Sequence, residues 1–478
     1  MGVKDKKTGN LPWIAAALAL TAVALALWAL PGVGISADAI TYASVSRNLT
    51  QGGVLRSFDR DMYVDFPVGY PFFLGVIQWV TRVDPLAFGQ VVNAILFGLL
   101  VAGVIGMLER EGVTKWQRTL IGACVAASPA LLQVYEMLWS ETLFIFCIGV
   151  FLWAGAWYGR THSWRAFWLM VAAAGVAAVT RYAGVTVIAT GGLVLLLEHK
   201  RIGRAFLFGT VASAPLAINL VRNRLIGGTV TGDRQKNLLP LSVHLNRFGG
   251  VLCEWTPPLD RAKWLYTAVA ILFLLVIVVA WWRSRKRPAG LFAIALTLAA
   301  VYSAFILTTA MLTAFEALDT RLLAPLVVPA LIGLGNTLPK KTVILALLII
   351  SSVAADIRYI KDPGIAYKSY VRYDPAALDR SPTITFVNRQ PVLLDSNTSV
   401  YTNAPDILYW KTRRVSSDYL PSLDDPEDLR DFRYDHGAYL IWIDACLAYP
   451  KAYLDRLKQQ VSLELVYTFP DGAIYIYK

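Results

Sequence analysis

The segment that decides the fold lies near the N-terminus, where residues 11–30 read LPWIAAALALTAVALALWAL. These 20 residues carry no charge, and as an α-helix they would rise about 30 Å, the thickness of the hydrocarbon core of a bilayer. Lys4, Lys6 and Lys7 precede the segment, as in a signal peptide. Its apolar core, however, is longer than the apolar region of a signal peptide, which has roughly 7 to 15 residues. In addition, PGVG at 31–34 does not match an Ala-x-Ala cleavage site. We therefore predict that the segment is retained as the first membrane-spanning helix.

The composition of the whole chain agrees with a membrane protein. Of the 478 residues, 56% are hydrophobic and 16% are charged, whereas soluble domains average roughly 45 to 50% and 25%. The aromatic share of 12% excludes a disordered chain, and four cysteines are too few for a secreted disulfide scaffold. The chain is therefore expected to cross a membrane several times.

Ten further apolar segments follow the first. They cover residues 86–108, 119–132, 142–158, 166–179, 185–197, 205–220, 264–282, 291–312, 322–338 and 342–355. Some reach the roughly 17 to 25 residues that a helix needs to cross a bilayer, and several are shorter or marked by glycine or proline. The expected fold class is a mainly α, polytopic membrane protein with about 11 transmembrane helices within residues 1–355.

Lysine and arginine gather in alternate loops between these segments. The basic loops are residues 110–118, 160–165, 200–204, 283–287 and 340–341. Because basic loops are retained on the cytoplasmic side, the N-terminus is predicted to be cytoplasmic. The net charge of +12 then reflects membrane topology, and no nucleic-acid partner is expected. The long loops and the C-terminal tail fall on the opposite side.

The tail, residues 356–478, differs from the rest of the chain because its acidic and basic residues roughly balance. Alternating apolar and polar residues predict strands over 399–402, 439–443 and 474–477. Two segments opened by proline, 405–412 and 450–460, predict helices. We expect a small α/β domain outside the membrane.

The interiors of the predicted spans are nearly free of charged residues, and polar groups gather at their outer ends. A proton- or ion-coupled carrier usually places charges near the middle of the membrane. This distribution favours a reaction at the outer surface. A transporter or flippase of a lipid-linked substrate remains the alternative.

The first outer loop contains an acidic residue at the start of a predicted short interfacial helix. Ser36 is a candidate N-cap, so Asp38 would lie in the first turn, with Tyr42 one turn later. Asp38 is either a functional carboxylate or only a favourable charge at the positive end of the helix dipole. Asp59 and Asp61 fit a solvated loop, whereas Asp65 directly precedes an aromatic, proline-bounded segment.

Several motifs on the predicted outer face together resemble those of the GT-C superfamily of membrane glycosyltransferases. They are the helix with Asp38 and Tyr42, DFPVGYP at 65–71, SETLF at 140–144, TRYAG at 180–184 and RLLAP at 321–325. The resemblance covers residues 12–329 and is strongest to the branch of lipid A aminoarabinose transferases and protein O-mannosyltransferases. Many relatives carry two adjacent acids in the first loop, whereas position 39 here is alanine.

The resemblance implies an inverting transfer of a sugar from a polyprenyl-phosphate donor, with Asp38 as the base that takes the proton of the acceptor hydroxyl. Asp65 and Glu141 would supply the acceptor or second acidic site, although Glu141 can instead orient the base or cap its helix. Tyr42 and Tyr70 would line the donor and acceptor pocket.

Cations near the headgroup plane would stabilise the charge that develops on the departing lipid phosphate. Arg321 resembles the basic residue that contacts donor phosphate in relatives, unless it reaches the membrane interface or pairs with Asp319. Arg181 faces the same side, where it either binds phosphate or caps a turn. Further candidates lie in the loop 222–263, namely Arg234, His244 and Arg247.

Other chemistry has no support in the sequence. No nucleotide-binding fingerprint, serine-hydrolase elbow or zinc-ligand spacing is present. No cofactor is firmly implied, and the need for a divalent metal stays open. The expected partners are a polyprenyl-phosphate sugar donor, a lipid, glycan or protein acceptor, and membrane lipids. The expected location is a bacterial inner membrane, with the C-terminal domain on the periplasmic side.

Overall fold

The structure is a computed structural model. It describes residues 11–28, 32–59, 61–198, 200–232, 234–256, 259, 262–284, 290–314, 317–337, 341–361, 373–395, 397–417, 420–433, 437–444, 449 and 451–478. Residues 285–287 and 340, which belong to two of the predicted cytoplasmic loops, lie outside the described residues.

The chain divides into two compact units. The first comprises Met1–Gly34 and Tyr63–Pro363, and the second comprises Ile35–Met62 and Gly364–Lys478. Residues 35–62 of the first outer loop thus belong with the C-terminal tail, whereas Asp65 and the segment after it belong to the first unit. The boundary expected at residue 355 falls inside helix α16 of the first unit, Lys341–Lys361.

The first unit is helical and contains the apolar segments. Its longer helices are α1 Leu11–Trp28, α3 Gly69–Thr81, α4 Pro85–Arg110, α5 Lys115–Ala126, α7 Ser140–Thr161, α8 Trp164–Thr180, α10 Ile202–Gly227, α11 Leu241–Glu254, α12 Tyr266–Ser284, α13 Leu291–Leu312, α15 Val327–Thr337 and α16. The shorter elements are α6 Pro129–Glu136, η1 Tyr182–Gly184, α9 Val185–Leu193, η2 Val194–Glu198, β1 Gln235–Lys236, η3 Lys263–Leu265, β2 Thr313–Ala314, α14 Thr320–Leu323 and η4 Ala324–Leu326.

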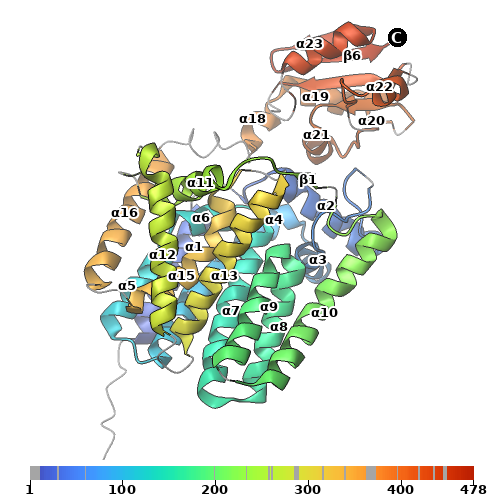
Figure 1. Ribbon diagram of the computed structural model, residues 1–478. Helices are drawn as coiled ribbons and strands as arrows, with labels where there is room; N and C mark the ends of the chain where they lie inside the picture. Colours follow the sequence, from blue (N-terminus) through green and yellow to red (C-terminus); the bar gives the residue numbers. More distant parts are fainter. Residues whose placement is uncertain are drawn as a thin grey trace, which may run out of the picture. The chain divides into compact units, whose positions relative to one another are not determined.

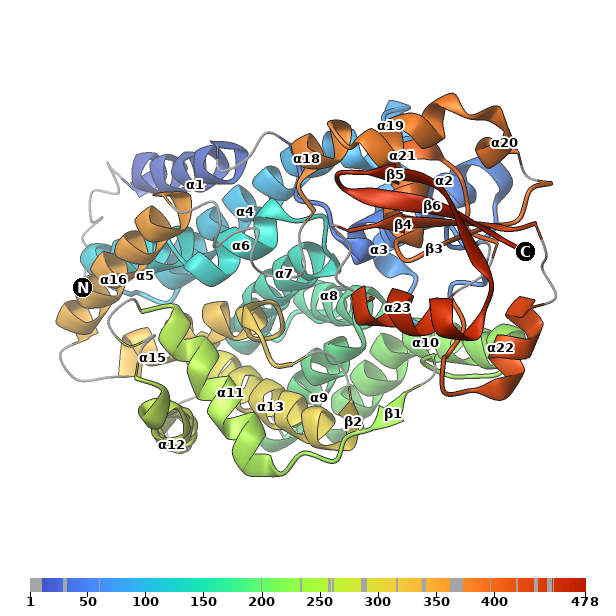
Figure 2. The same ribbon diagram turned by 90° about the horizontal axis from the view of Figure 1, so that it is seen from above.

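Neighbouring helices of the first unit run side by side. Helices α7, α8 and α9 pack against one another (Figure 1), and α13 lies beside both α9 and α11 (Figure 2). Short strands β1 and β2 pair in antiparallel fashion, which ties the loop after α10 to the end of α13.

Within the described residues, five helices are long and apolar enough to cross a membrane, or six if a bent pair counts as one span. The five are Pro85–Arg110, Ser140–Thr161, Ile202–Gly227, Lys263–Ser284 and Leu291–Leu312. Five shorter apolar helices accompany them. Each of the 11 predicted apolar segments contains a helix, but the segment 119–132 is broken and bends by 47°. The break occurs because Ser128 caps a new helix whose first residue is Pro129.

Two of these helices expose apolar rather than polar surface. In the spans Ile202–Gly227 and Lys263–Ser284, only 22% and 17% of the apolar window is buried, against 72% in Ser140–Thr161. Ile218 and Leu225 on α10 and Leu272 on α12 are among the exposed side chains. A water-soluble protein would bury such faces, whereas a bilayer accepts them. The chain is a multi-pass membrane protein.

The second unit contains a four-stranded mixed sheet with the order β3-β4-β6-β5. Strands β3 Val400–Thr402 and β4 Tyr439–Ile443 are parallel. Strand β6 Gly472–Tyr477 is antiparallel to β4 and to the edge strand β5 Leu463–Phe469. The helices are α2 Ala37–Gly52, α18 Pro375–Asp379, α19 Pro382–Arg389, α20 Pro391–Leu394, α21 Pro405–Thr412, α22 Pro426–Arg433 and α23 Lys451–Gln460.

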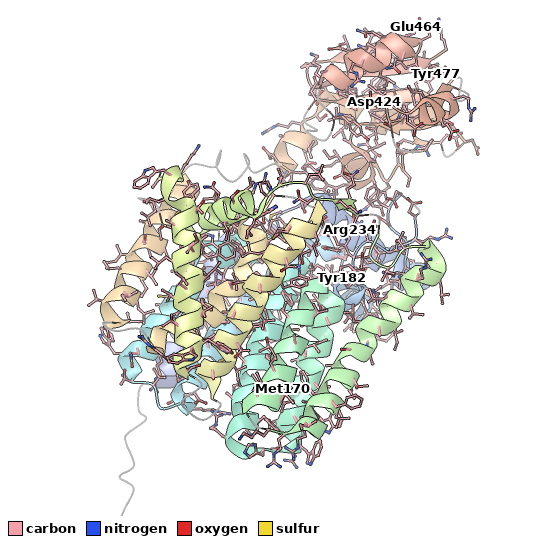
Figure 3. All side chains as sticks on the ribbon, in the orientation of Figure 1. Met170, Tyr182, Arg234, Asp424, Glu464 and Tyr477 are labelled. Carbon is pink, nitrogen blue, oxygen red and sulfur yellow. The ribbon has the colours of Figure 1, made fainter. Side chains whose placement is uncertain are left out.

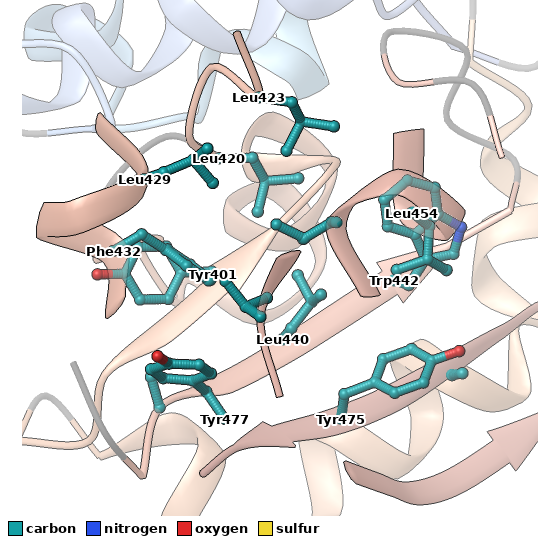
Figure 4. Close-up of a cluster of buried hydrophobic side chains, with 14 residues drawn as sticks. Tyr401, Leu420, Leu423, Leu429, Phe432, Leu440, Trp442, Leu454, Tyr475 and Tyr477 are labelled. Atoms are coloured by element: carbon teal, nitrogen blue, oxygen red, sulfur yellow. The ribbon is translucent and has the colours of Figure 1, made fainter. Parts of the chain in front are cut away.

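Successive side chains of each strand point to opposite faces of the sheet, and both faces are buried. Leu440 and Trp442 of β4 pack in one cluster with Phe432 and Leu454 (Figure 4). The intervening Ile441 packs in a second cluster on the opposite face, together with side chains of α19 to α21. Both faces of the sheet are therefore covered by helices, as expected for a sheet with a parallel crossover.

The structure confirms the strands and helices predicted for the tail and adds elements that the sequence analysis missed. Strand β5 was missed, as were helices α3 and α11 in the first unit. Pro71 in the first turn of α3 is compatible with a helix because the first amide groups have no intrahelical partner.

Candidate active site

The candidate site of the first unit is built around the beginning of helix α7. Trp139 is the N-cap of this helix, and Ser140 and Glu141 are its first two residues. The preceding segment is tied to the chain after α1, because the Gly34 amide donates to the Glu136 carbonyl at 2.7 Å and the Leu138 amide donates to the Gly34 carbonyl at 3.0 Å. A side chain at position 34 would collide with Met137. The start of α7 is thus held in place from outside the helix.

Glu141 is completely buried and pairs with two arginines from distant parts of the chain. Its Oε1 lies 2.5 Å from Nη1 of Arg181. Arg321 donates from Nε to Oε1 and from Nη2 to Oε2, the latter at 3.4 Å, so its planar fork meets both carboxylate oxygens. Ser140 donates to Glu141 at 3.2 Å and accepts from Arg181 Nη1 at 3.0 Å. We call Ser140, Glu141, Arg181 and Arg321 the Glu141 cluster.

The short helix α14 positions Arg321. Asp319 caps this helix by accepting from the Leu322 amide at 2.9 Å, and Tyr302 of α13 donates to the Leu322 carbonyl at 2.9 Å. The Arg321 guanidinium lies 4.5 Å from the centre of the Trp139 ring, within cation-π range. The Glu141 carboxylate, the Trp139 ring and the capped helix α14 together fix the orientation of the Arg321 side chain.

Gly69 and Gly184, from the motifs DFPVGYP and TRYAG, allow their backbones to pack closely against the end of α8, which fixes the position of Arg181. A Cβ on Gly69, at the start of α3, would lie 2.5 Å from the carbonyl oxygen of Val179. A Cβ on Gly184 would collide with the backbone of Ala177 and Ala178. Both glycines thus pack against the last turn of α8, directly before Arg181. This close approach is a structural reason for glycine in the motifs DFPVGYP and TRYAG.

A second polar group joins Asp65 to the loop after α10. Arg234 donates from Nη2 to the Asp65 carbonyl at 3.0 Å and from Nε to the Thr231 carbonyl at 3.0 Å. The Asp65 carboxylate packs against Gly232, whose φ of +77° and crowded surroundings exclude a side chain. The sequence analysis named Asp65 and Arg234 separately, and the structure brings them together.

Tyr182 and Asn223 connect this group to the helices and were not predicted as site residues. Asn223 is buried and donates to the Val64 carbonyl at 3.0 Å and to the Tyr182 hydroxyl at 3.3 Å. Arg222 donates to the Tyr63 carbonyl at 2.8 Å. The sequence signals were the position of Tyr182 in the motif TRYAG and that of Asn223 between two arginines. Tyr182 and Arg234 lie toward one end of the helices and Met170 toward the other (Figure 3).

The remaining candidates of the first unit lie in other surroundings. His244 is buried on α11, where Nε2 lies 3.2 Å from the side-chain nitrogen of Asn237. Arg247 is half-buried on the same helix. Tyr70 is buried at the start of α3, with its ring stacked on Phe73 at 6.3 Å between centroids.

Asp38 and Tyr42 belong to the second unit. Ser36 caps α2 by accepting from the Ala39 amide at 3.3 Å, and this places Asp38 in the first turn as predicted. Asp38 is half-buried, whereas Tyr42 is fully buried. Eight residues of α2 are buried.

Across the described ranges, no group of three or more His, Cys, Asp or Glu side chains is placed to hold a metal ion.

Sequence and structure comparisons give different results. No protein-family model and no curated protein matches the sequence. Among solved structures, apo ArnT from Cupriavidus metallidurans is similar over 98% of this chain and 98% of its own, with a TM-score of 0.52 and 16% identity. The same protein bound to undecaprenyl phosphate gives a TM-score of 0.52 at 14% identity, again over 98% of both chains.

The archaeal oligosaccharyltransferase AglB from Archaeoglobus fulgidus, in complex with an inhibitory peptide and a dolichol-phosphate, is also similar. The match covers 99% of this chain and 74% of AglB, with a TM-score of 0.54 and 12% identity. At such identities the likeness concerns the fold. The chain has the fold of the GT-C membrane glycosyltransferases.

Proposed function

We propose that the chain is an inverting glycosyltransferase that moves a sugar from a polyprenyl-phosphate donor to an acceptor on the outer face of a bacterial inner membrane. Two proteins with the same fold have been solved with a polyprenyl or dolichol phosphate bound. The Glu141 cluster is the observation that carries the proposal for this chain.

The donor phosphate is assigned to Arg181 and Arg321. Arg181 uses only Nη1 in its contacts within the described residues, and its side chain is 19% exposed. A guanidinium has five N–H donors in a fixed plane, so Nε and Nη2 can still donate to phosphate oxygens. Glu141 keeps both guanidiniums in position before the substrate arrives. Preset cations of this kind stabilise charge that develops on a leaving group.

Asp38 is assigned the role of base. The acceptor hydroxyl attacks the anomeric carbon and gives its proton to the Asp38 carboxylate, while the bond between that carbon and the phosphate oxygen breaks. Polyprenyl phosphate leaves with the electron pair, and the configuration at the anomeric carbon inverts. Asp38 suits this role because it is half-buried, so it can exchange a proton, whereas Glu141 is held between two cations.

The other predicted residues are given supporting roles. Asp65, held against Gly232 and Arg234, belongs to the acceptor side. His244 and Arg247 on α11 and Arg234 in the segment before it would contact the donor headgroup, and Tyr42 and Tyr70 would line the pocket. Orientation follows from the basic loops, which place the N-terminus in the cytoplasm and the outer ends of the helices in the periplasm.

The direct test supplies the purified chain, in sealed proteoliposomes, with polyprenyl-phosphate sugars of several types and with envelope extract as acceptor. The proposal expects labelled sugar to leave the lipid and appear on an acceptor, and it expects Arg181→Gln and Arg321→Gln to abolish this transfer. Movement of the intact lipid-linked sugar across the bilayer, without cleavage of the sugar-phosphate bond, would instead identify a flippase.

A further inference from the structure

The second unit contains a cavity of about 460 Å³ at the C-terminal end of α2. Its lining includes Asn48, Gln51, Arg56, Ser57, Phe58 and Tyr409, which come from α2, from the loop after it and from α21. The cavity is distinct from the Glu141 cluster, which lies in the first unit. Its volume falls within the range of small-ligand sites.

The cavity is formed by a loop that is tied back onto α2. Gly53 ends the helix with a φ of +68°, a conformation that favours glycine, so the chain turns back there. The side chain of Asn48 donates to the Arg56 carbonyl at 2.8 Å, and the Ser57 amide donates to the Asp61 carbonyl at 2.9 Å. The walls are thus fixed by hydrogen bonds.

One wall is aromatic and the others present polar groups. The rings of Phe58 and Tyr409 stack with centroids 5.4 Å apart. The side chains of Gln51 and Arg56 and the hydroxyl of Tyr409 make no hydrogen bond or ion pair within the described residues. Arg56 is exposed, and among the described residues of the lining it is the one ionised group. Asp59 and Asp61 follow in the same loop but do not line the cavity.

We infer that this cavity binds an anionic saccharide and holds it as part of the acceptor. An aromatic wall suits the apolar C–H face of a sugar ring, and amide and hydroxyl side chains suit its hydroxyl groups. A single arginine without a lining carboxylate selects a carboxylate or phosphate substituent. That the bound saccharide is the acceptor rests on the proposed function, whereas the binding itself does not.

The position of the cavity on α2 suggests how such an acceptor would be used. Asp38 begins the helix on which Asn48 lies, ten residues later. At 1.5 Å per residue, the two lie about 15 Å apart along the helix axis. An extended acceptor held at the cavity can therefore reach toward the proposed base with a different part of its chain. This favours a glycan, among lipid, glycan and protein acceptors.

The test measures saccharide binding to the full chain in nanodiscs without any donor, by ligand-observed NMR titration. The probe is trigalacturonic acid, and maltotriose is its neutral counterpart. Trigalacturonic acid should bind, and Arg56→Gln should weaken binding about tenfold because it removes a charged hydrogen bond. Tyr409→Phe, which keeps the ring stack, should weaken it a few-fold.

Arg380→Gln is the matched control, since Arg380 is an exposed arginine of the same unit outside the cavity. It should leave binding unchanged. No binding of trigalacturonic acid, equally tight binding of maltotriose, or full binding by the Arg56→Gln variant would overturn the inference. Glycosyl transfer measured in parallel separates the two proposals, since saccharide binding without any transfer from polyprenyl-phosphate sugars would contradict the proposed function alone.

Discussion

Helices α2 and α7 each carry an acidic side chain in the first turn, but the two carboxylates differ in how deeply they are buried. Glu141 on α7 is completely buried and contacts two guanidiniums and the Ser140 hydroxyl. Asp38 on α2 is half-buried, and its helix is capped by Ser36. Position in a helix is therefore a poor guide to the role of an acid.

This difference separates two tasks that glycosyl transfer requires. A carboxylate between two cations remains ionised and keeps the cations in place, but it is a poor proton acceptor. A partly exposed carboxylate can take a proton from an acceptor and release it to water. We therefore treat Glu141 as a positioning residue and Asp38 as the catalytic candidate.

The largest expected effect is that of Asp38→Asn. The amide cannot take a proton, so kcat should fall by about 10² to 10⁴. The melting temperature, measured alongside, separates loss of the base from loss of folding. Initial rates and thermal unfolding of the purified protein measure both. Asp59→Asn in the same unit is the control and should keep full activity. Full activity of Asp38→Asn would remove the distinction between the two acids.

The second largest effect is expected from Glu141→Gln, which should lower both stability and activity. Two arginines would lose their shared counter-charge in a buried place, which costs about 3 to 5 kcal/mol. A large fall in melting temperature, with loss of transfer, is expected. Glu109→Gln breaks a more exposed pair with Arg118 at 3.6 Å and should cost under about 1 kcal/mol. Equal stability of the two variants would show that the cluster does not depend on its carboxylate.

A smaller loss of stability is expected from Gly184→Ala. This variant tests whether the close packing of Gly184 against the end of α8 fixes the position of Arg181. The added methyl would meet the backbone of Ala177 and Ala178, and such overpacking costs about 1 to 3 kcal/mol. Gly192→Ala on α9, where the added atom meets nothing within 4 Å, is the control. Thermal unfolding of both variants checks this. Indistinguishable melting temperatures would mean that the turn has room to relax.

The smallest effect should come from Asp406 in the second unit. Burial raises the pKa of this carboxyl, and the hydrogen bond from Tyr373 lowers it only in part. Because the folded pKa is raised, folding favours the protonated acid, and stability is lost as pH rises from the ordinary carboxyl range through the raised value. Asp406→Asn should remove this loss and stabilise the unit at neutral pH. Melting temperatures between pH 4 and pH 8 provide the test, and a steeper pH dependence in the variant would contradict it.

Much of the helical fold could be predicted because apolar length and loop charge are local properties. Each predicted apolar segment contains a helix, and the segment 405–412 coincides with α21. Helix α11 was missed because polar residues interrupt its apolar face, and β5 because it is an exposed edge strand. The break at Ser128 was missed because hydropathy does not register a new N-cap within an apolar run.

The site could be predicted only as separate residues. Glu141, Arg181 and Arg321 were each named from short motifs. Arg321 was expected to contact the donor phosphate, with the membrane interface or a pair with Asp319 as alternatives, and its pairing with Glu141 was not foreseen. The pairing with Glu141 joins residues 180 positions apart, and no local pattern encodes such a distance. Likewise, the cavity at Arg56 combines the first outer loop with α21 of the tail, which the sequence analysis had assigned to different domains.

By itself, the sequence determined that this chain is helical, apolar and membrane-embedded, since the free energy of burying apolar residues depends on composition and length alone. It also identified which residue types can act on a phosphate or a hydroxyl. Only the tertiary structure decided that one carboxylate is enclosed by two arginines while another stays accessible. Burial and pairing depend on which distant segments meet, and it is burial and pairing that give two similar acids different chemistry.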